Sequence, residues 1–252
     1  MTPKLTQDQK EVIVSMYDDY SCVDIAKIVG VTLNQVYDLR KRLGITKKQN
    51  PIFELTDLQH QILLGGKLGD GNFKPNGNHN YYYRESHAED ELRYLIWKMD
   101  QLGNMINNQG LYKIKKAGYN VQQLYGFSTV TSPSLIYYAE SSLEAIIPQL
   151  DYRGLIIFML DDGTFSTHSK AGKFVISCWI LDEQQIDLLC NQYEQNGIYG
   201  VHRVGKKKYE LTIPSSNNTK LLEMATSFIP IKTDIIQKKF GHIIKNLSNM
   251  IV

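Results

Sequence analysis

Two short apolar segments end in the dipeptide Asp-Gly and place one carboxylate at the same point of two similar stretches. Residues 63–71 read LLGGKLGDG and residues 155–163 read LIIFMLDDG, so Asp70 and Asp162 stand 92 positions apart. A turn, a strand and a helix are expected after each segment. Such a duplicated unit predicts a pseudo-twofold molecule whose two acids meet on the axis. This arrangement suits chemistry on a substrate that is itself twofold, such as a DNA duplex.

Glycines inside the first segment indicate that two helices approach each other closely. Gly65, Gly66 and Gly69 each cost a helix about 1 kcal/mol relative to alanine. Because Gly65 and Gly69 are four residues apart, a second helix can pack against them with its backbone nearly in contact. We therefore expect the two Asp-bearing helix ends to meet. Two carboxylates held together repel each other, and a shared divalent cation relieves that repulsion.

Oxygen ligands at this junction favour Mg²⁺ or Mn²⁺, with Ca²⁺ as a substitute in binding. We predict Asp70 and Asp162 as the principal metal ligands. The backbone carbonyls of Gly69 and Asp161 are further candidates, because carbonyls at helix ends lack intrahelical partners. The Asp161 side chain is an alternative ligand. Metal ions at two symmetric positions suit in-line hydrolysis of a phosphodiester bond in each of two strands.

Composition is typical of a globular protein, with 42% hydrophobic and 21% charged residues among 252. No apolar run approaches the roughly 20 residues of a membrane span, so no membrane partner is expected. Three cysteines without CxxC spacing predict a reducing intracellular compartment, cytoplasmic or otherwise, in a bacterial, phage or organellar setting.

Charge is distributed unevenly along the chain. Residues 1–50 carry 8 basic and 6 acidic side chains, and residues 198–252 carry 9 and 3, whereas residues 51–197 carry 11 and 17. Basic ends suit phosphate binding, and a middle rich in carboxylates suits metal binding.

The first fifty residues predict three short helices, over residues 6–17, 22–29 and 33–43. Residues 23–36 (VDIAKIVGVTLNQV) resemble the helix-turn-helix of bacterial regulators, whose last helix enters the major groove. A small packing module with a solvated basic face is the alternative. The polar stretch TKKQNP at residues 46–51 predicts a domain boundary. The predicted DNA contacts of this helix are Asn34, Gln35, Arg40, Lys41 and Arg42.

The two Asp-Gly segments resemble the paired motifs of the LAGLIDADG homing endonucleases, in the subgroup that carries both motifs on one chain. The resemblance covers about residues 53–245. It implies an α+β fold in which two pseudo-twofold αββαββα repeats form a DNA-binding saddle, plus the small all-α helix-turn-helix domain. The predicted domains are residues 1–50, 51–150 and 151–252.

The same resemblance implies an intron-encoded or free-standing monomeric nuclease. It would hydrolyse double-stranded DNA with Mg²⁺ at a long, partly asymmetric target site. Members of the family often carry a catalytic lysine near the end of the second repeat. Residues 230–240 (PIKTDIIQKKF) match that stretch, with Lys238 as the predicted counterpart beside Asp70 and Asp162. The first repeat lacks a matching lysine before Pro148, so nicking or unequal strand rates are alternatives to symmetric cleavage.

The strands of both repeats are expected to position phosphates and read base edges. An ordinary charged sheet face is the alternative for any one of these residues. The predicted contacts are Tyr81, Tyr83, Arg84, Lys113, Lys115, Lys116, Arg203, Lys206, Lys207 and Lys208.

Two other functions remain open on the sequence. One is an RNA maturase that binds intron RNA on the same scaffold, and the other is a DNA-binding regulator that does not cut. An acid retained in both motifs disfavours the regulator. A helix-turn-helix suits B-form DNA better than RNA, which disfavours the maturase.

Overall fold

The computed structural model describes residues 4–17, 20, 22–44, 50–77, 79–115, 122–167, 172–205 and 208–250. The chain divides into two compact units, Met1–Gln49 and Asn50–Val252, and the second unit contains both repeats. Within these described ranges, none of the helices has the length and apolar character needed to cross a bilayer.

The first unit consists of three helices around a small apolar core. Thr6 and Thr32 each begin a helix with a reciprocal capping box, in which the side chains of Gln9 and Gln35 accept from the cap backbone. The helices are α1 (Gln7–Met16), α2 (Cys22–Val29) and α3 (Leu33–Arg42). Their buried core residues are Ile13, Ile25, Ala26, Val36 and Leu39.

The second unit repeats one order of elements twice, as predicted. The first repeat comprises α4 (Asp57–Leu68), β1 (Asn72–Pro75), β2 (Tyr81–Ala88), α5 (Leu92–Leu102), β3 (Tyr112–Ile114), β4 (Leu124–Ser128) and α6 (Ile136–Glu140). The second comprises α8 (Tyr152–Asp162), β5 (Gly163–Ser166), β6 (Lys173–Ser177), α9 (Glu183–Gln195), β7 (His202–Val204), β8 (Glu210–Ile213) and α10 (Asn218–Thr226).

Shorter elements and one further helix complete this unit. The 3₁₀ turn η1 (Glu89–Glu91) leads into α5, and α7 (Leu143–Ile146) links the two repeats. The further helix α11 (Asp234–Met250) follows the second repeat. The remaining 3₁₀ turns are η2 (Gly103–Met105), η3 (Pro133–Leu135), η4 (Ile147–Gln149) and η5 (Ser215–Asn217).

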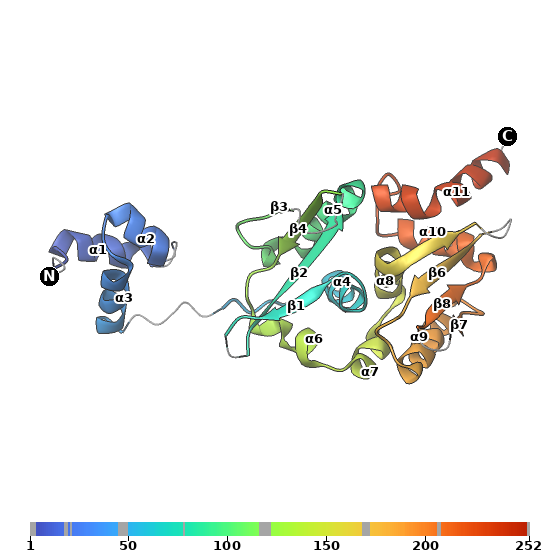
Figure 1. The fold of residues 1–252 in the computed structure, drawn as a ribbon, viewed down its shortest axis with the longest axis horizontal. Helices are drawn as coiled ribbons and strands as arrows, with labels where there is room; N and C mark the ends of the chain where they lie inside the picture. Colours follow the sequence, from blue (N-terminus) through green and yellow to red (C-terminus); the bar gives the residue numbers. More distant parts are fainter. Residues whose placement is uncertain are drawn as a thin grey trace. The chain divides into compact units, whose positions relative to one another are not determined.

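Each repeat folds its strands into one antiparallel sheet of four. The strand orders are β1-β2-β4-β3 and β5-β6-β8-β7, so the two sheets have the same topology. Helices α4 and α8 lie side by side between the sheets (Figure 1). Both are buried on almost all sides along their middle and last turns, which explains why residues 62–66 and 154–160 are apolar on every face rather than on one. The predicted α+β fold of two repeats is therefore confirmed.

The glycines of α4 allow the close approach that the sequence predicted. A side chain added to Gly65 would begin 2.6 Å from the carbonyl oxygen of Gly154 and 3.0 Å from Ile157. One added to Gly69 would begin 2.6 Å from the side chain of Asp161. A residue later in α4 therefore contacts a residue later in α8. The two helices are parallel, and their carboxyl ends lie together.

Replacing Gly65 by alanine is expected to destabilise the protein by about 1–3 kcal/mol, because the added methyl group meets backbone that cannot move aside. Gly241 in α11 is the matched control, because nothing lies within 4 Å of a side chain added there. Gly241→Ala is expected to stabilise the helix by up to about 1 kcal/mol. Urea unfolding of both variants measures these effects. Equal stabilities would contradict the tight helix contact.

Candidate active site

The carboxyl ends of α4 and α8 bring three aspartates into one region. Asp70 follows the end of α4, and Asp161 and Asp162 are the last two residues of α8. The Asp161 carboxylate crosses to the other repeat, where its Oδ2 accepts from the backbone N–H of Asp70 at 3.5 Å. It occupies the space that the absent side chain of Gly69 leaves free. Asp161 therefore joins the two helix ends.

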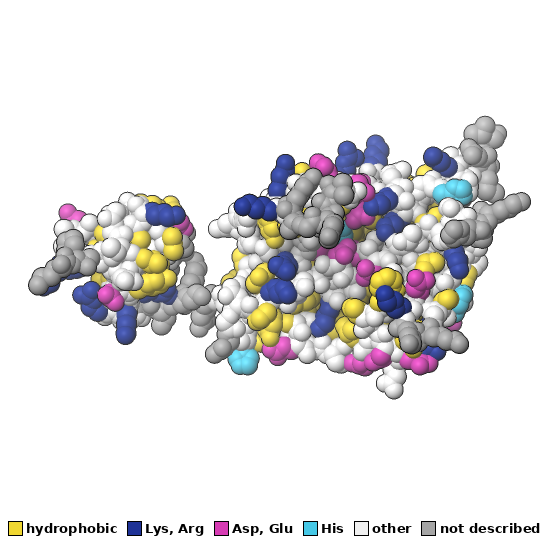
Figure 2. Space-filling model, in the orientation of Figure 1, with side chains coloured by type: hydrophobic (Ala, Val, Ile, Leu, Met, Phe, Trp, Pro, Cys, Tyr) yellow, Lys and Arg dark blue, Asp and Glu magenta, His cyan; other side chains and the backbone are white. Residues whose placement is uncertain are grey.

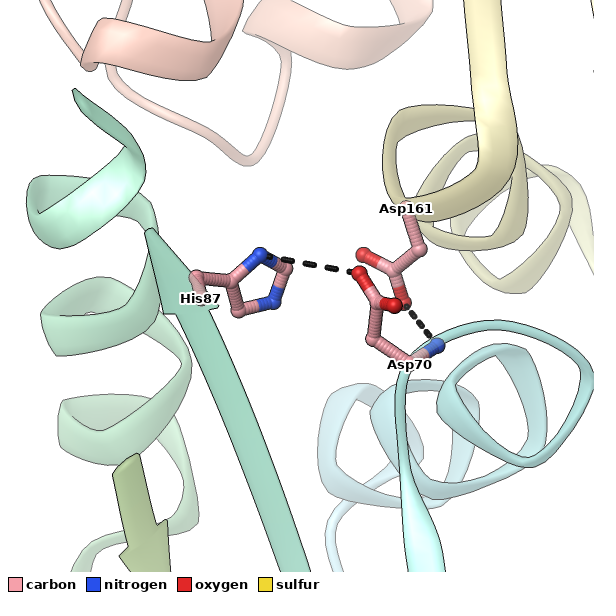
Figure 3. A group of neighbouring side chains, drawn as sticks. All are labelled: Asp70, His87 and Asp161. Atoms are coloured by element: carbon pink, nitrogen blue, oxygen red, sulfur yellow. Dashed lines mark hydrogen bonds and ion pairs between the residues drawn. The ribbon is translucent and has the colours of Figure 1, made fainter. Parts of the chain in front are cut away.

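His87, in strand β2, is the third side chain of this group. Its Nδ1 lies 3.6 Å from Oδ2 of Asp70. Ligand atoms of Asp70, His87 and Asp161 all lie within 4.8 Å of one another. Figure 3 shows the three side chains pointing toward one another from α4, β2 and α8. The Asp70 side chain is 40% exposed, whereas the other two are buried.

Two of the aspartates lie where negative charge is unfavourable. Burial raises the pKa of Asp70 to about 7, the charge of Asp161 adds to the rise, and His87 opposes it. Burial likewise raises the pKa of Asp162 to about 6, again helped by Asp161 and opposed by Lys239. A cation bound at these oxygens would remove the unfavourable charge.

The sequence model of the LAGLIDADG DNA endonuclease family matches residues 60–221, which span both Asp-Gly segments. The chain belongs to the LAGLIDADG DNA endonuclease family. The predicted family resemblance is therefore confirmed.

The chain is also similar to solved structures and to curated proteins. The homing endonuclease I-WcaI bound to its DNA recognition sequence has a TM-score of 0.60 at 15% identity, over 82% of this chain and 94% of that chain. This likeness shows the fold. Protein RecA of Mycolicibacterium flavescens is 28% identical over 123 residues, which are 46% of this chain and 28% of that protein. The chain thus spans less than a third of the curated relatives that it matches.

His87 does not fit as a ligand of a divalent ion in this LAGLIDADG protein, although it lies beside Asp70 and Asp161. His87 Nε2 contacts Glu85 Oε1 at 2.6 Å, and its Nδ1 contacts Glu91 Oε2 at 2.9 Å. Burial lowers the pKa of His87, but these two hydrogen bonds outweigh it and raise the pKa to about 10. An imidazolium has no lone pair to offer a metal. The carboxylate oxygens of Asp70 and Asp162 are hard ligands of the kind that Mg²⁺ and Ca²⁺ prefer.

The two neighbouring lysines of α11 have different surroundings. Lys238, the predicted catalytic lysine, forms ion pairs with Asp90 at 2.9 Å and Glu91 at 2.8 Å and is exposed. Lys239 instead donates to the carbonyl of Gly163, directly after Asp162. Burial lowers the pKa of Lys239. The structure therefore places Lys239 beside the second motif and leaves Lys238 on the surface. The catalytic role of Lys238 stays a prediction.

Tyr83 is the predicted DNA contact that the structure contradicts. Its side chain is fully buried, and its hydroxyl donates to Glu85. Gly66 and Gly71 pack against the ring, where a side chain on either glycine would meet it. The prediction failed because alternation along a strand separates two faces without stating which one is buried.

The other predicted sheet contacts are placed as follows. Arg84 is exposed and lines a surface hollow together with Asp70 and Asn72. Lys113 and Lys115 are exposed, and Tyr81 donates to Glu140. Arg203 pairs with Glu183 at 2.6 Å, and the Lys208 ammonium lies 4.2 Å from the centre of the Trp179 ring. Lys116, Lys206 and Lys207 lie outside the described residues.

In the first unit, Asn34, Lys41 and Arg42 are exposed on α3. Two of the predicted base or phosphate contacts have other partners there. Gln35 Oε1 accepts from the backbone N–H of Thr32 in the capping box. Arg40 Nη1 lies 3.8 Å from the Cys22 sulfur.

The raised pKa of Asp70 predicts how stability depends on pH without a metal ion. The folded state binds a proton at Asp70 near pH 7, whereas the ordinary value is 3.8. Between these values the folded state holds more protons than the unfolded chain, so the free energy of unfolding falls as pH rises. In EDTA, Asp70→Asn is therefore expected to have a higher melting temperature than the parent at pH 8 but not at pH 5.

Addition of Ca²⁺ is the control for this prediction. The ion pairs with the carboxylate of the parent but not with the amide of Asp70→Asn, so the difference at pH 8 should shrink. Thermal melts at both pH values, with EDTA or Ca²⁺, give the answer. A parent that is more stable than the variant at pH 8 in EDTA would contradict the conclusion that negative charge on Asp70 destabilises the folded state without a metal ion.

Proposed function

We propose that this protein is a site-specific endonuclease that cuts both strands of double-stranded DNA with divalent metal ions. The observation that carries this proposal is that the parallel helices α4 and α8 end beside each other, each at its motif aspartate, with the Asp161 side chain linking the two ends. The raised pKa values of the two motif aspartates favour binding of a cation. Because both motifs are on one chain, a monomer holds the complete site.

Asp70 and Asp162 would hold Mg²⁺, together with backbone carbonyl oxygens at the helix ends such as that of Gly69. When bound, the ions supply charge neutralisation at the scissile phosphates and acidify water. The Lys239 ammonium, held by the Gly163 carbonyl, would stabilise negative charge near the Asp162 side. The first repeat has no lysine in the matching place before Pro148, so we expect the two strands to be cut at different rates.

The exposed faces of the two sheets would bind the duplex around the cleavage site. Arg84 leads from the Asp70 hollow onto the exposed face of the first sheet, where Tyr112 and Ile114 line the same hollow. Lys113 stands opposite Tyr125 and His87 in the register, so it is exposed at the sheet edge on the other face. On the face in Figure 2, basic side chains are mixed with acidic ones over residues 50–252 rather than gathered in one block. Binding by scattered phosphate contacts over a long site is consistent with this pattern. The I-WcaI structure, named as bound to its DNA recognition sequence, supports this use of the fold.

The first unit would extend the bound site through α3. Asn34 and Lys41 are exposed on this helix, as a major-groove contact requires. Lys41→Gln is expected to weaken binding to all DNA sequences and to lower the slope of log K against log salt by about 1. Fluorescence anisotropy at several salt concentrations measures this slope. An unchanged slope would leave α3 without a phosphate contact at this position.

The test of the proposed function is cleavage of a plasmid library with a randomised site. The chain is incubated with Mg²⁺, and the cut ends are sequenced. Ends that share one long sequence, and that are absent in EDTA, are expected. DNA binding without cleavage under any divalent ion would instead favour a regulator, and selective binding of intron RNA would favour a maturase.

A further inference from the structure

A cluster of buried charged side chains lies behind the motif aspartates in the first repeat. Lys98, on α5, is fully buried. Its Nζ lies 2.8 Å and 2.9 Å from the two carboxylate oxygens of Asp161 and 2.5 Å from Glu85 Oε1. Three N–H groups thus meet three oxygens, which satisfies the ammonium completely. Such a cluster is stable only while every charge keeps its partner.

The second repeat has no charges at the equivalent positions. Asn72 pairs with Arg84 in the first sheet, and Thr164, at the same distance after its motif aspartate, pairs with Val175 in the second. Arg84 and Val175 are therefore equivalent positions of the two repeats. By the same count along the strands, Glu85 is equivalent to Ile176 and His87 to Cys178. The matching pattern of buried positions in α5 and α9 makes Lys98 equivalent to Leu189. The fold therefore does not need this cluster. The first repeat carries it for another reason.

The hydrogen bonds of Asp161 leave it no free ligand atom. Oδ1 accepts from Tyr94 at 3.0 Å and from Lys98, and Oδ2 accepts from Lys98 and from the Asp70 backbone. A divalent ion at Asp161 would have to displace a buried ammonium or sit beside its positive charge. Both are unfavourable where water does not screen the charges. Asp70, by contrast, keeps 40% of its side chain exposed.

We propose that Lys98 is a positioning residue whose ammonium takes the place of a divalent ion between Asp161 and Glu85. It fixes Asp161 as a structural link between the repeats, and it leaves Asp70 and Asp162 as the metal ligands. The inference rests on the proposed function for the identity of those ligands. It assigns Asp161 a role different from the metal ligation that the sequence suggested.

The first experiment counts the Ca²⁺ ions bound by the full chain, by isothermal titration without DNA. Asp161→Asn is expected to bind as many Ca²⁺ ions as the parent with unchanged affinity, whereas Asp70→Asn is expected to lose a site. Asparagine retains an oxygen for Tyr94 and Lys98, but its NH2 group replaces the oxygen that accepts from Lys98 and from the Asp70 backbone, so the melting temperature of this variant is measured beside its Ca²⁺ binding. Loss of a Ca²⁺ site in Asp161→Asn would overturn the proposal.

The second experiment removes the ammonium. In Lys98→Met, Asp161 lacks a cation and Glu85 keeps only His87, so Ca²⁺ is expected to raise the melting temperature far more than in the parent. The double variant Lys98→Met/Asp161→Asn is expected to lose this extra dependence. Leu189→Met, the same side chain at the matching place of the second repeat, is the control and should respond to Ca²⁺ as the parent does. A Lys98→Met protein with the parental Ca²⁺ response would contradict the inference.

These measurements separate the inference from the proposed function. Neither of them requires cleavage or DNA. A parent that binds no Ca²⁺ would count against the proposed metal-dependent nuclease, while a new Ca²⁺ dependence in Lys98→Met would still support the substitution of an ammonium for a metal ion.

Discussion

Asparagine in place of Asp70 is expected to lower the rate of DNA cleavage by at least about 10³-fold at saturating Mg²⁺. Asp70 presents a partly exposed carboxylate at the junction of the two repeats, and its raised pKa favours a bound cation. A metal ion at a phosphate contributes several kcal/mol in the transition state. Loss of about 4 kcal/mol corresponds to about 10³ in rate. Asp162→Asn is expected to have an effect of similar size.

A supercoiled plasmid that carries the selected target site gives the readout, because nicked and linear products separate on a gel. Asp100→Asn, which removes an exposed acid from α5, is the matched control and should cut like the parent. End-labelling each strand shows which strand depends on which aspartate. If Asp70→Asn formed linear plasmid as fast as the parent, Asp70 would have no catalytic role.

The helix junction was predictable from sequence because two independent signals agreed. The duplicated Asp-Gly segments placed one acid in each repeat, and Gly65 and Gly69 stood on one helix face where their cost in helix stability required a reason. Close packing against Gly154 and Asp161 supplies that reason. Local periodicity and short capping patterns were enough to find these features.

The buried charges of the first repeat were not predictable in the same way. Glu85 and His87 share a strand face with Tyr83, and a face with two charged residues usually points to solvent. Lys98 is in phase with Leu95 and Leu102 on the apolar side of α5, which was the available signal. This spacing predicts that Lys98 is buried. It does not predict that Asp161 is its partner, because Asp161 lies 63 residues away in the other repeat. Only the fold brings the two together.

The buried cluster also makes the two repeats unequal at their contact. Asp161 extends from the second repeat into the first, while its counterpart Gly69 has no side chain to extend back. Around Asp70 lies a buried set of charges, and beside Asp162 lies Lys239. The two aspartates at the same place in the motif thus have different electrostatic surroundings, which favours unequal rates on the two DNA strands.

The two lysines of α11 test this difference through a pair of matched variants. Lys239→Met is expected to lower the cleavage rate about 10²-fold or more, the usual contribution of a positioned charged or proton-transferring side chain. Lys239 lies against Gly163, and burial lowers its pKa, so its ammonium is poised near Asp162. The loss should be larger for the strand cut on the Asp162 side.

Lys238→Met is the control, because it removes the adjacent lysine and creates the same side chain. The ion pairs with Asp90, which is exposed, and with Glu91, which is partly buried, are lost, which lowers stability by about 1 kcal/mol. Single-turnover cleavage of a target with each strand labelled distinguishes the two variants. If Lys238→Met were the slower enzyme, the catalytic lysine would be the residue first suggested by sequence, and the placement of Lys239 beside Gly163 would not describe the working site. Consecutive residues of a helix point their side chains in different directions. Only one of these two neighbouring lysines can therefore extend toward the scissile phosphate.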